Sequence, residues 1–136
     1  MCISGLNHLQ DPNPARTMIQ FAAELMQVVH KRQQSAPSEN ERVRVRMGLS
    51  TGSVAAGILG KFRRKWTVMG DCVNCASRLE SLGQPMCLHL TRECAEEAGL
   101  PLGKFTPQVL TPKGLGEIQS FILTQSDLEN MLGIHR

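Results

Sequence analysis

The chain has 136 residues, 41% of them hydrophobic, which is enough for one packed globular domain and too few for two. Its net charge of +3 favours no particular acidic partner, and one Trp, four Phe and no Tyr argue against a stacking surface for nucleic acid. No apolar run approaches the ~18 residues of a membrane span, and the first residues lack the pattern of a secretory signal, so we expect no membrane contact from this segment.

The N-terminal third predicts a long helix. Residues 1–6 are typical of a strand end followed by a glycine turn. Asn13 and Pro14 then supply an N-cap and a first-turn proline. Apolar residues recur at helical spacing up to about Lys31, and we expect this stripe to pack in the core: Met18, Phe21, Ala22, Leu25, Met26 and Val29. A polar loop is predicted at 33–41.

The next segment alternates in a way that is typical of strands. Apolar residues occupy every second position from Val43 to Leu49, which predicts a strand with one apolar face. Residues 51–60 are expected to continue this strand, because their small side chains permit close backbone approach. Residues 61–65 (Lys-Phe-Arg-Arg-Lys) predict a basic turn, and 66–69 a returning strand. Such a charge run is usually a solvated tip; a dimer arm or a phosphate contact is the alternative.

Residues 71–82 predict a two-sided helix. At ~100° per residue, Asn74 and Arg78 lie one turn apart on a polar side, together with Ser77 and Ser81. The opposite side is apolar and is expected to face the core: Cys72, Cys75, Ala76, Leu79 and Leu82. An Asn/Arg pair considered alone is most simply a part of an ordinary exposed helix surface.

The ends of this helix and the rest of the chain follow from local signals. We expect Asp71 to cap the helix, Gly83 to adopt a left-handed conformation at its end, and Pro85 to prevent its continuation. A strand is then predicted at 87–90, a helix from 91 to about 98, strands near 105–110 and 118–124, and a tail at 127–136. Interleaved helices and strands indicate an α/β sandwich with helices packed against one sheet.

The five cysteines are an odd number without the spacing of a disulfide framework: Cys2, Cys72, Cys75, Cys87 and Cys94. The C-x-x-C formed by Cys72 and Cys75 raises a redox or zinc interpretation. No second pair or histidine cluster follows it, and both residues lie on the apolar side of the predicted helix. Buried, reduced thiols of a cytosolic domain are therefore the better interpretation.

Four blocks of sequence occur in a recognisable order and spacing. They are 46–60 (Arg-Met-Gly-Leu-Ser-Thr-Gly-Ser-Val-Ala-Ala-Gly-Ile-Leu-Gly), 66–71 (Trp-Thr-Val-Met-Gly-Asp), 70–85 with its Gly-Asp-Cys-Val-Asn-Cys-Ala-Ser-Arg-Leu-Glu-Ser, and 113–116 (Lys-Gly-Leu-Gly). In this arrangement the chain resembles the class III nucleotide cyclase catalytic domain, the adenylate and guanylate cyclase family. The resemblance covers about residues 1–124, as a partial domain, and leaves 125–136 as a C-terminal tail. It implies a ferredoxin-like βαββαβ core with an added hairpin, truncated at its N-terminus.

The resemblance also implies an activity and site residues. Family members convert a purine nucleoside triphosphate to its 3′,5′-cyclic monophosphate and pyrophosphate for signalling in the cytoplasm. Asn74 matches the family's Asn that orients the ribose, and Arg78 its Arg that stabilises the α-phosphate, for which a planar guanidinium is well suited. Lys113 matches a contact for the terminal phosphates, although Leu115 replaces the second Lys of that motif. A plain strand-end lysine is the alternative for Lys113.

The resemblance further assigns Thr67 to the position that reads the purine base. Members resembling adenylate cyclases carry Asp or Thr there, whereas those resembling guanylate cyclases carry Cys. A hydroxyl can donate and accept hydrogen bonds, so it suits adenine, and we expect ATP to be favoured over GTP. A threonine selected for its β propensity is the alternative.

The family's two metal-binding Asp residues fall before the position of Met1. Asp11, Asp71 and Asp127 do not match that context, so we assign no metal ligand to this chain. Mg²⁺ or Mn²⁺ is expected to be held by an upstream segment or by a partner subunit.

Family members form head-to-tail dimers, so we expect a second cyclase domain as partner and little activity from this segment alone. A non-catalytic cyclase-like module for dimerisation or nucleotide sensing is the alternative, and an unrelated ferredoxin-like binding domain leaves the four blocks unexplained.

Overall fold

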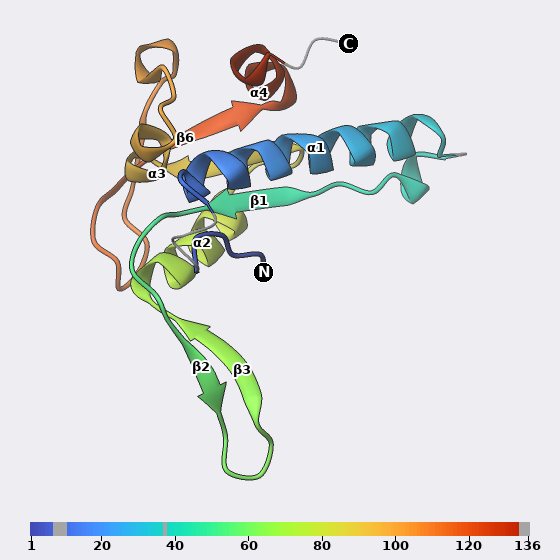
Figure 1. Ribbon diagram of the computed structural model, residues 1–136. Coiled ribbons are helices and arrows are strands. Elements are labelled where there is room, and N and C mark those ends of the chain that lie inside the picture. The colour runs from blue at the N-terminus through green and yellow to red at the C-terminus, as the bar shows by residue number, and fades with distance from the viewer. Residues whose placement is uncertain (7–10, 37, 134–136) are drawn as a thin grey trace.

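The computed structural model describes residues 1–6, 11–36 and 38–133 of the chain. Its main sheet consists, in spatial order, of β1 (Arg46–Leu49), β4 (Cys87–Thr91), β6 (Ile118–Thr124) and β5 (Gln108–Leu110) (Figure 1). β1 is parallel to β4, whereas the β4–β6 and β5–β6 pairs are antiparallel. β1 therefore lies at one edge of the sheet and β5 at the other.

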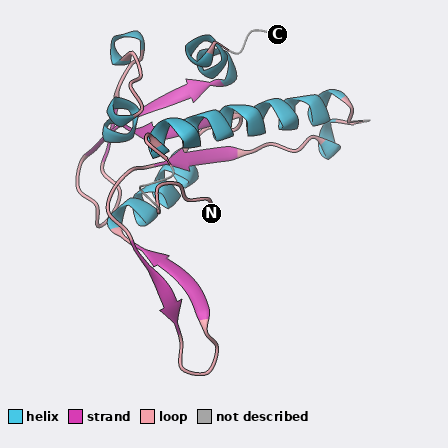
Figure 2. Cartoon of the chain, in the orientation of Figure 1, coloured by secondary structure: helices cyan, strands magenta, loops and turns pink. Residues whose placement is uncertain are grey.

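Helices cover both faces of this sheet (Figure 2). They are α1 (Pro14–Gln34), α2 (Asp71–Leu82), α3 (Arg92–Glu97) and α4 (Gln125–Leu132), with short 3₁₀ turns at Glu39–Glu41 and Leu102–Lys104. In β4, Leu88 and Leu90 belong to the core that contains residues of α1, α3 and α4. His89 between them points to the other face, where it contacts the backbone of α2 at Leu79, because side chains alternate along a strand. This arrangement confirms the predicted α/β class.

Helix α1 begins where the sequence predicts. The Asn13 side chain accepts a hydrogen bond from the backbone N–H of Arg16 at 2.9 Å, and Pro14 occupies the first turn. The helix runs to Gln34, about one turn beyond the predicted end, and so shortens the predicted loop.

The buried side of α1 is only partly the predicted stripe. It comprises Ala15, Ile19, Ala22, Ala23, Met26 and Val29. Phe21, which was expected in the core, is 45% exposed, and Met18 and Leu25 are half-buried. The apolar surface of α1 is therefore wider than the part that the core covers. The three remaining apolar residues line a cleft that is described below.

A two-stranded hairpin, β2 (Ala55–Leu59) and β3 (Lys65–Met69), projects away from the main sheet (Figure 1). The added hairpin is confirmed, but the prediction that residues 51–60 continue the preceding strand is wrong. The two connections cross tightly at the hairpin's base, where a Cβ on Gly70 would lie 2.6 Å from the Ser53 carbonyl oxygen. This crossing separates β2 from β1.

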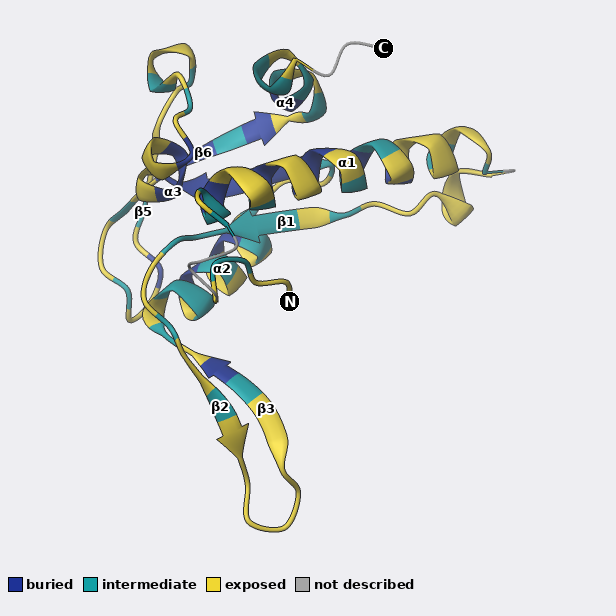
Figure 3. Cartoon of the chain, in the orientation of Figure 1, coloured by how far each residue is buried: buried dark blue, intermediate teal, exposed yellow. Residues whose placement is uncertain are grey.

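The hairpin is mostly exposed (Figure 3). Large apolar side chains contribute to this surface, with Ile58 66%, Phe62 95% and Trp66 59% exposed. All five residues of the basic turn, 61–65, are exposed as well. Within the described chain the basic turn is therefore an exposed tip, which is compatible with both the solvated tip and the dimer arm or phosphate contact considered above.

Strand ends differ from the prediction where pairing is lost. β1 begins at Arg46 rather than Val43, since its register with β4 starts at the Arg46–Cys87 pair. β5 covers only Gln108–Leu110, and residues 1–6 form no strand. The predicted glycine turn is present, because Gly5 has a φ of 79°. The alternation of apolar and polar residues in the sequence therefore continues past the residues that pair with a neighbouring strand.

Helix α2 ends before Pro85 as predicted, but the roles predicted for Asp71 and Gly83 at its two ends are wrong. Gly70 occupies the N-cap position and Asp71 is the first helical residue, and no side chain of the described residues caps the helix. Gly83 has a φ of −77° and is not left-handed. A Cβ at Gly83 would lie 3.0 Å from the Leu79 carbonyl oxygen, so this glycine provides close approach to the helix end. The first residue after α2 with a left-handed backbone conformation is Met86, with a φ of 59°.

The C-terminal segment predicted as a tail contains helix α4. Thr124 and Asp127 form a capping box at its start, in which each side chain bonds the other residue's backbone N–H. Leu128 is fully buried and belongs to the main core. The T-x-x-D signal and the apolar residues after it were present in the sequence and predict this helix.

Candidate functional site

Helix α2 is held on β1 by a close backbone contact. A Cβ at Gly48 in β1 would lie 2.1 Å from the Ala76 carbonyl oxygen and 2.4 Å from the Glu80 nitrogen. An ion pair between Arg46 and Glu80, 2.9 Å between Nη2 and Oε1, spans the same two elements at the surface. Strand and helix are therefore nearly in backbone contact, and little can move between them.

The two sides of α2 have the predicted character. Cys75 and Leu79 are buried, with Leu79 0% exposed, and Cys72 and Ala76 are half-buried. Leu82 is an exception at 53% exposed, because it lies in the last turn beyond the sheet contact. On the opposite side Asn74, Ser77, Arg78 and Ser81 are all exposed.

Asn74 and Arg78 are available for contacts outside the described chain. Neither side chain forms a hydrogen bond or ion pair with another described residue. They lie at i and i+4 and so point from one face of a helix whose other face is packed. An amide and a guanidinium in this arrangement offer several N–H donors to an anionic ligand, and the guanidinium is always charged.

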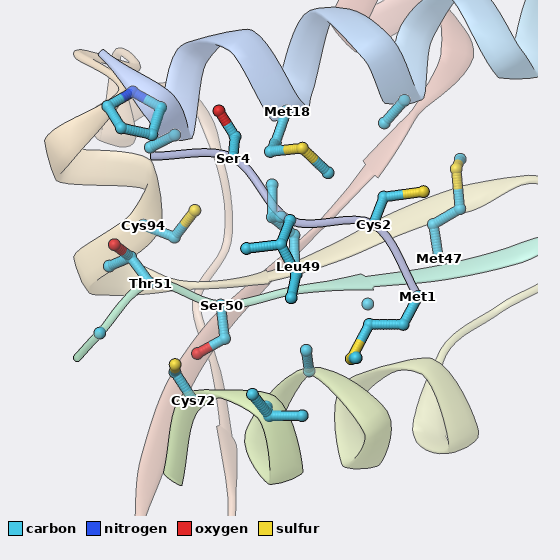
Figure 4. A pocket seen from close by; sticks show the side chains of 18 of the residues that line it. Met1, Cys2, Ser4, Met18, Met47, Leu49, Ser50, Thr51, Cys72 and Cys94 are labelled. Atoms are coloured by element: carbon cyan, nitrogen blue, oxygen red, sulfur yellow. The ribbon is translucent and has the colours of Figure 1, made fainter. Parts of the chain in front are cut away.

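A cleft of about 1120 Å³ opens between α1, β1 and α2 (Figure 4). Its walls are largely apolar and include Met18 of α1 and Met47 and Leu49 of β1, while Asn74 contributes at the α2 side. The N-terminal residues Met1, Cys2 and Ser4 pass through this space (Figure 4). Arg78, Thr67 and Lys113 are not among the lining residues, so the cleft and the predicted site overlap only at Asn74.

Comparison with known proteins identifies the family. The model of the adenylate and guanylate cyclase catalytic domain matches residues 1–121. This chain belongs to that family. Thus the resemblance inferred from four sequence blocks is confirmed.

Similar proteins agree with this assignment. The cyclase domain is 31% identical over 127 residues to the receptor-type guanylate cyclase Gyc76C of Drosophila melanogaster, covering 91% of this chain and 8% of that protein. It is 32% identical to the receptor-type guanylate cyclase gcy-14 of Caenorhabditis elegans, covering 90% of this chain and 11% of that protein. The cyclase domain thus spans only a small part of these relatives.

Two solved structures have the same fold. The guanylate cyclase domain of RhGC from Catenaria anguillulae, in complex with GTP, is 28% identical with a TM-score of 0.69. The catalytic core of a rhodopsin-guanylyl cyclase with converted specificity, in complex with ATPαS, is 29% identical with a TM-score of 0.68. In each case the alignment covers 89% of this chain and 64% of the other. The nucleotide cyclase fold predicted from sequence is therefore confirmed.

Thr67 and Lys113 lie on elements other than the α2 face. Thr67 is half-buried in β3, four residues before α2 begins, and its hydroxyl donates to the Lys65 carbonyl oxygen at 3.3 Å. Lys113 is exposed in the connection between β5 and β6. The cyclase domain thus brings Asn74 and Arg78 onto one face, whereas the placement of Thr67 and Lys113 leaves their predicted roles untested.

The described carboxylates do not form a metal site. Asp11 is engaged by the hydroxyls of Ser4, at 2.6 Å, and Thr17, and these bonds, chiefly that of Ser4, lower its pKa. Asp127 belongs to the capping box, and Asp71 is exposed at the start of α2. No group of three or more His, Cys, Asp or Glu able to hold a metal occurs among the described residues. These residues therefore do not fit the divalent ion that the family resemblance implies.

The cysteines are free thiols in the described residues, and three of them are buried. Burial raises the pKa of Cys75 and of Cys87, and it raises that of Cys94 to about 12. A raised pKa keeps a thiol protonated at neutral pH and makes it unreactive. The prediction of buried thiols thus holds for Cys75, Cys87 and Cys94, whereas Cys2 is exposed and Cys72 is half-buried, with its thiol donating to the Ser53 carbonyl oxygen at 3.7 Å.

A buried histidine connects α2 to the sheet, a contact that the sequence alone did not reveal. His89 is 1% exposed, and its Nδ1 lies 3.0 Å from the Leu79 carbonyl oxygen and its Nε2 2.9 Å from Ser120 Oγ. A carbonyl oxygen only accepts, so Nδ1 carries the proton and Nε2 is the acceptor for Ser120. Burial lowers the pKa of His89, which keeps the ring neutral.

No described helix is long and apolar enough to cross a membrane.

Proposed function

We propose that this cyclase domain is part of an enzyme that converts a purine nucleoside triphosphate to its 3′,5′-cyclic monophosphate and pyrophosphate in intracellular signalling. The observation that carries the proposal is the pair Asn74 and Arg78, exposed one turn apart on a helix that Gly48 locks against β1. Rigid placement of donors is what electrostatic catalysis requires.

The reaction assigns a task to each of these side chains. The ribose 3′-hydroxyl oxygen attacks the α-phosphorus and a new P–O bond forms, while the bond to the leaving pyrophosphate breaks and the hydroxyl proton is released to solvent or to the pyrophosphate. Charge accumulates on the α-phosphoryl oxygens, where the Arg78 guanidinium supplies planar, charge-assisted hydrogen bonds. The Asn74 amide orients the ribose so that its 3′-oxygen is in line with the phosphorus. Any divalent ion needed in this step takes its ligands from outside the described residues.

A second cyclase domain completes the site in this proposal. Asn74 and Arg78 have no partners within the described chain and face outward, which suits a nucleotide held by a neighbouring subunit in a head-to-tail dimer. The chain then supplies the half-site that acts on the transition state, and the subunit carrying the metal carboxylates supplies the other.

The proposed substrate is ATP rather than GTP, and this preference rests on Thr67 alone. The relatives compared above are named guanylate cyclases, and the similar solved structures hold GTP or, with converted specificity, ATPαS. Thr67 is the position at which the resemblance separates the two groups, and its hydroxyl can pair with either adenine N6 or N1. Lys113 is proposed to contact the terminal phosphates as a mobile point charge.

The test is complementation of the chain by a cyclase domain that has both metal carboxylates. With Mg²⁺ or Mn²⁺, the mixture is expected to form cyclic AMP faster than cyclic GMP. Arg78→Ala should lower kcat by roughly 100-fold or more, and Arg78→Lys should restore little, because an ammonium lacks the planar fork. Ser81→Ala, on the same exposed helix face, is the matched control and should leave kcat unchanged.

The same experiment separates the enzyme from a non-catalytic cyclase-like module. Dimers that bind ATP but form no cyclic nucleotide, with Arg78 intact, would favour a dimerisation or sensing role and contradict catalysis. Faster formation of cyclic GMP than cyclic AMP would contradict only the substrate preference.

A further inference from the structure

Gly57 stands directly opposite Thr67 in the hairpin. The β2–β3 register pairs Gly57 with Thr67, Ile58 with Trp66 and Leu59 with Lys65. Opposite residues of an antiparallel pair present their side chains on the same face, with Cβ atoms about 4.5–5.5 Å apart. The space above Gly57 is therefore the space immediately beside the Thr67 side chain.

The fold of this chain does not require a glycine at this position. Gly57 does not have a positive φ, and an added Cβ would meet no atom of the described residues within 4 Å. Gly60 in the same hairpin differs, because it has a φ of 117° and its Cβ would lie 2.0 Å from the Arg63 carbonyl oxygen. A glycine inside a strand weakens the strand, and it often marks a place where a ligand or another backbone approaches closely.

The two faces of the hairpin have different shapes. On the face of Thr67, Gly57 leaves the centre open, the small Ala55 lies across from Met69, and Leu59 lies across from Lys65. The opposite face carries the bulky Ile58–Trp66 pair. The Thr67 face thus offers a flat floor with Met69 at one end, Leu59 and the charged Lys65 at the other, and one hydroxyl beside the floor.

We infer that Gly57 is a substrate-binding residue that leaves room for the purine base to lie flat on the hairpin beside the Thr67 hydroxyl. This inference rests on the proposed function and adds a steric element to it. A planar heterocycle needs an uninterrupted floor, and Gly57 is the position where any side chain would interrupt it. Thr67 then contacts the edge of the base while the hairpin backbone at Gly57 contacts its face.

The experiment compares Gly57→Ala and Gly57→Val with the wild type in the complemented mixture. Gly57→Val should raise KM for ATP by at least about tenfold, with a smaller increase for Gly57→Ala and a smaller change in kcat than in KM. Inhibition by inorganic tripolyphosphate, which has no base, should be unchanged. Ala56→Val is the matched control, since Ala56 is the exposed neighbour on the opposite face, and its KM should stay at the wild-type value.

The outcomes distinguish this inference from the proposed function. A wild-type mixture that neither binds nor turns over nucleotide overturns both. An active wild type with an unchanged KM for Gly57→Val overturns the inference alone. Loss of folding in Gly57→Ala, or loss of dimers at the assay concentration without a change in KM, also overturns it, because the glycine then serves the fold or a protein contact.

Discussion

In the main sheet, a glycine stands where the fold admits no side chain: Gly48 brings β1 into near contact with α2. In the hairpin, Gly57 stands where an added Cβ would lie more than 4 Å from every other described residue except its chain neighbours. Apolar residues show the same contrast, because Leu88 and Leu123 in the sheet are at most 1% exposed, whereas Phe62 at the hairpin tip is 95% exposed. Packing within this chain accounts for the sheet residues. Gly57 and Phe62 of the hairpin have no such explanation among the described residues, so partners for these two positions are to be sought outside them.

The largest effect is expected from Gly48→Val. The new Cβ would overlap the Ala76 carbonyl oxygen, and neither the strand nor the helix backbone can yield without losing its own hydrogen bonds. We expect a loss of about 4 kcal/mol or more in the free energy of unfolding, enough to prevent folding of a marginally stable domain. Urea titration followed by circular dichroism measures it. Gly57→Val is the matched substitution in the hairpin and should leave the midpoint unchanged or raised. Equal losses in both variants would remove the contrast.

The second largest effect is expected from Leu128→Ala in α4. Leu128 is 0% exposed within the main core, so its truncation removes apolar contacts and leaves a cavity. A loss of about 3 kcal/mol in the free energy of unfolding follows. Leu82→Ala, at an exposed helix position, is the control and should cost far less. If Leu128→Ala lowered the free energy of unfolding only slightly, the C-terminal helix would not be part of the cooperatively folding unit. It would then behave as the tail that the sequence predicted.

The sequence predicted elements well where one local signal was sufficient. The Asn13–Pro14 start, the two sides of α2 and the strand at 118–124 each rest on such a signal, and each is present. The break after β1 was not predictable from alternation, because small residues continue through 51–60 and the crossing of Gly70 over Ser53 is a tertiary contact. The missed helix α4 is different, since its capping box was visible in the sequence.

The candidate site also differs between features that local sequence signals predict and features that depend on long-range contacts. Helical periodicity correctly predicted that Asn74 and Arg78 share an exposed face. Periodicity does not predict which surface that face meets, and the apolar cleft beside it includes Asn74 but not Arg78. The roles of Thr67 and Lys113 depend on long-range placement and, in the proposed dimer, on a second chain. Such information is not contained in local sequence patterns.

A smaller effect is expected from the pH dependence of the main sheet's stability. Burial places the folded-state pKa of His89 below its ordinary value of 6.5. At a pH below about 6.5 the unfolded chain therefore binds a proton that the folded chain does not, so stability falls as the pH decreases, by at most about 1.4 kcal/mol per pH unit. Urea midpoints between pH 5 and 8 should show this slope, which His89→Gln should reduce. His30→Gln, at an exposed position of α1, serves as control, and an unaltered slope in His89→Gln would contradict the assignment.

The smallest effect on folding is expected from Phe62→Ser at the hairpin tip. Because the Phe62 side chain is almost fully exposed, its removal changes little apolar burial, and the free energy of unfolding should change by less than about 0.5 kcal/mol. A large exposed phenylalanine between basic residues nevertheless favours self-association in water, so the variant should also be more soluble at high concentration. Urea titration measures the free energy of unfolding, and sedimentation velocity measures self-association. A loss of stability comparable to that of Leu128→Ala would mean that the tip packs against the chain after all, and the distinction between sheet and hairpin would then be one of degree.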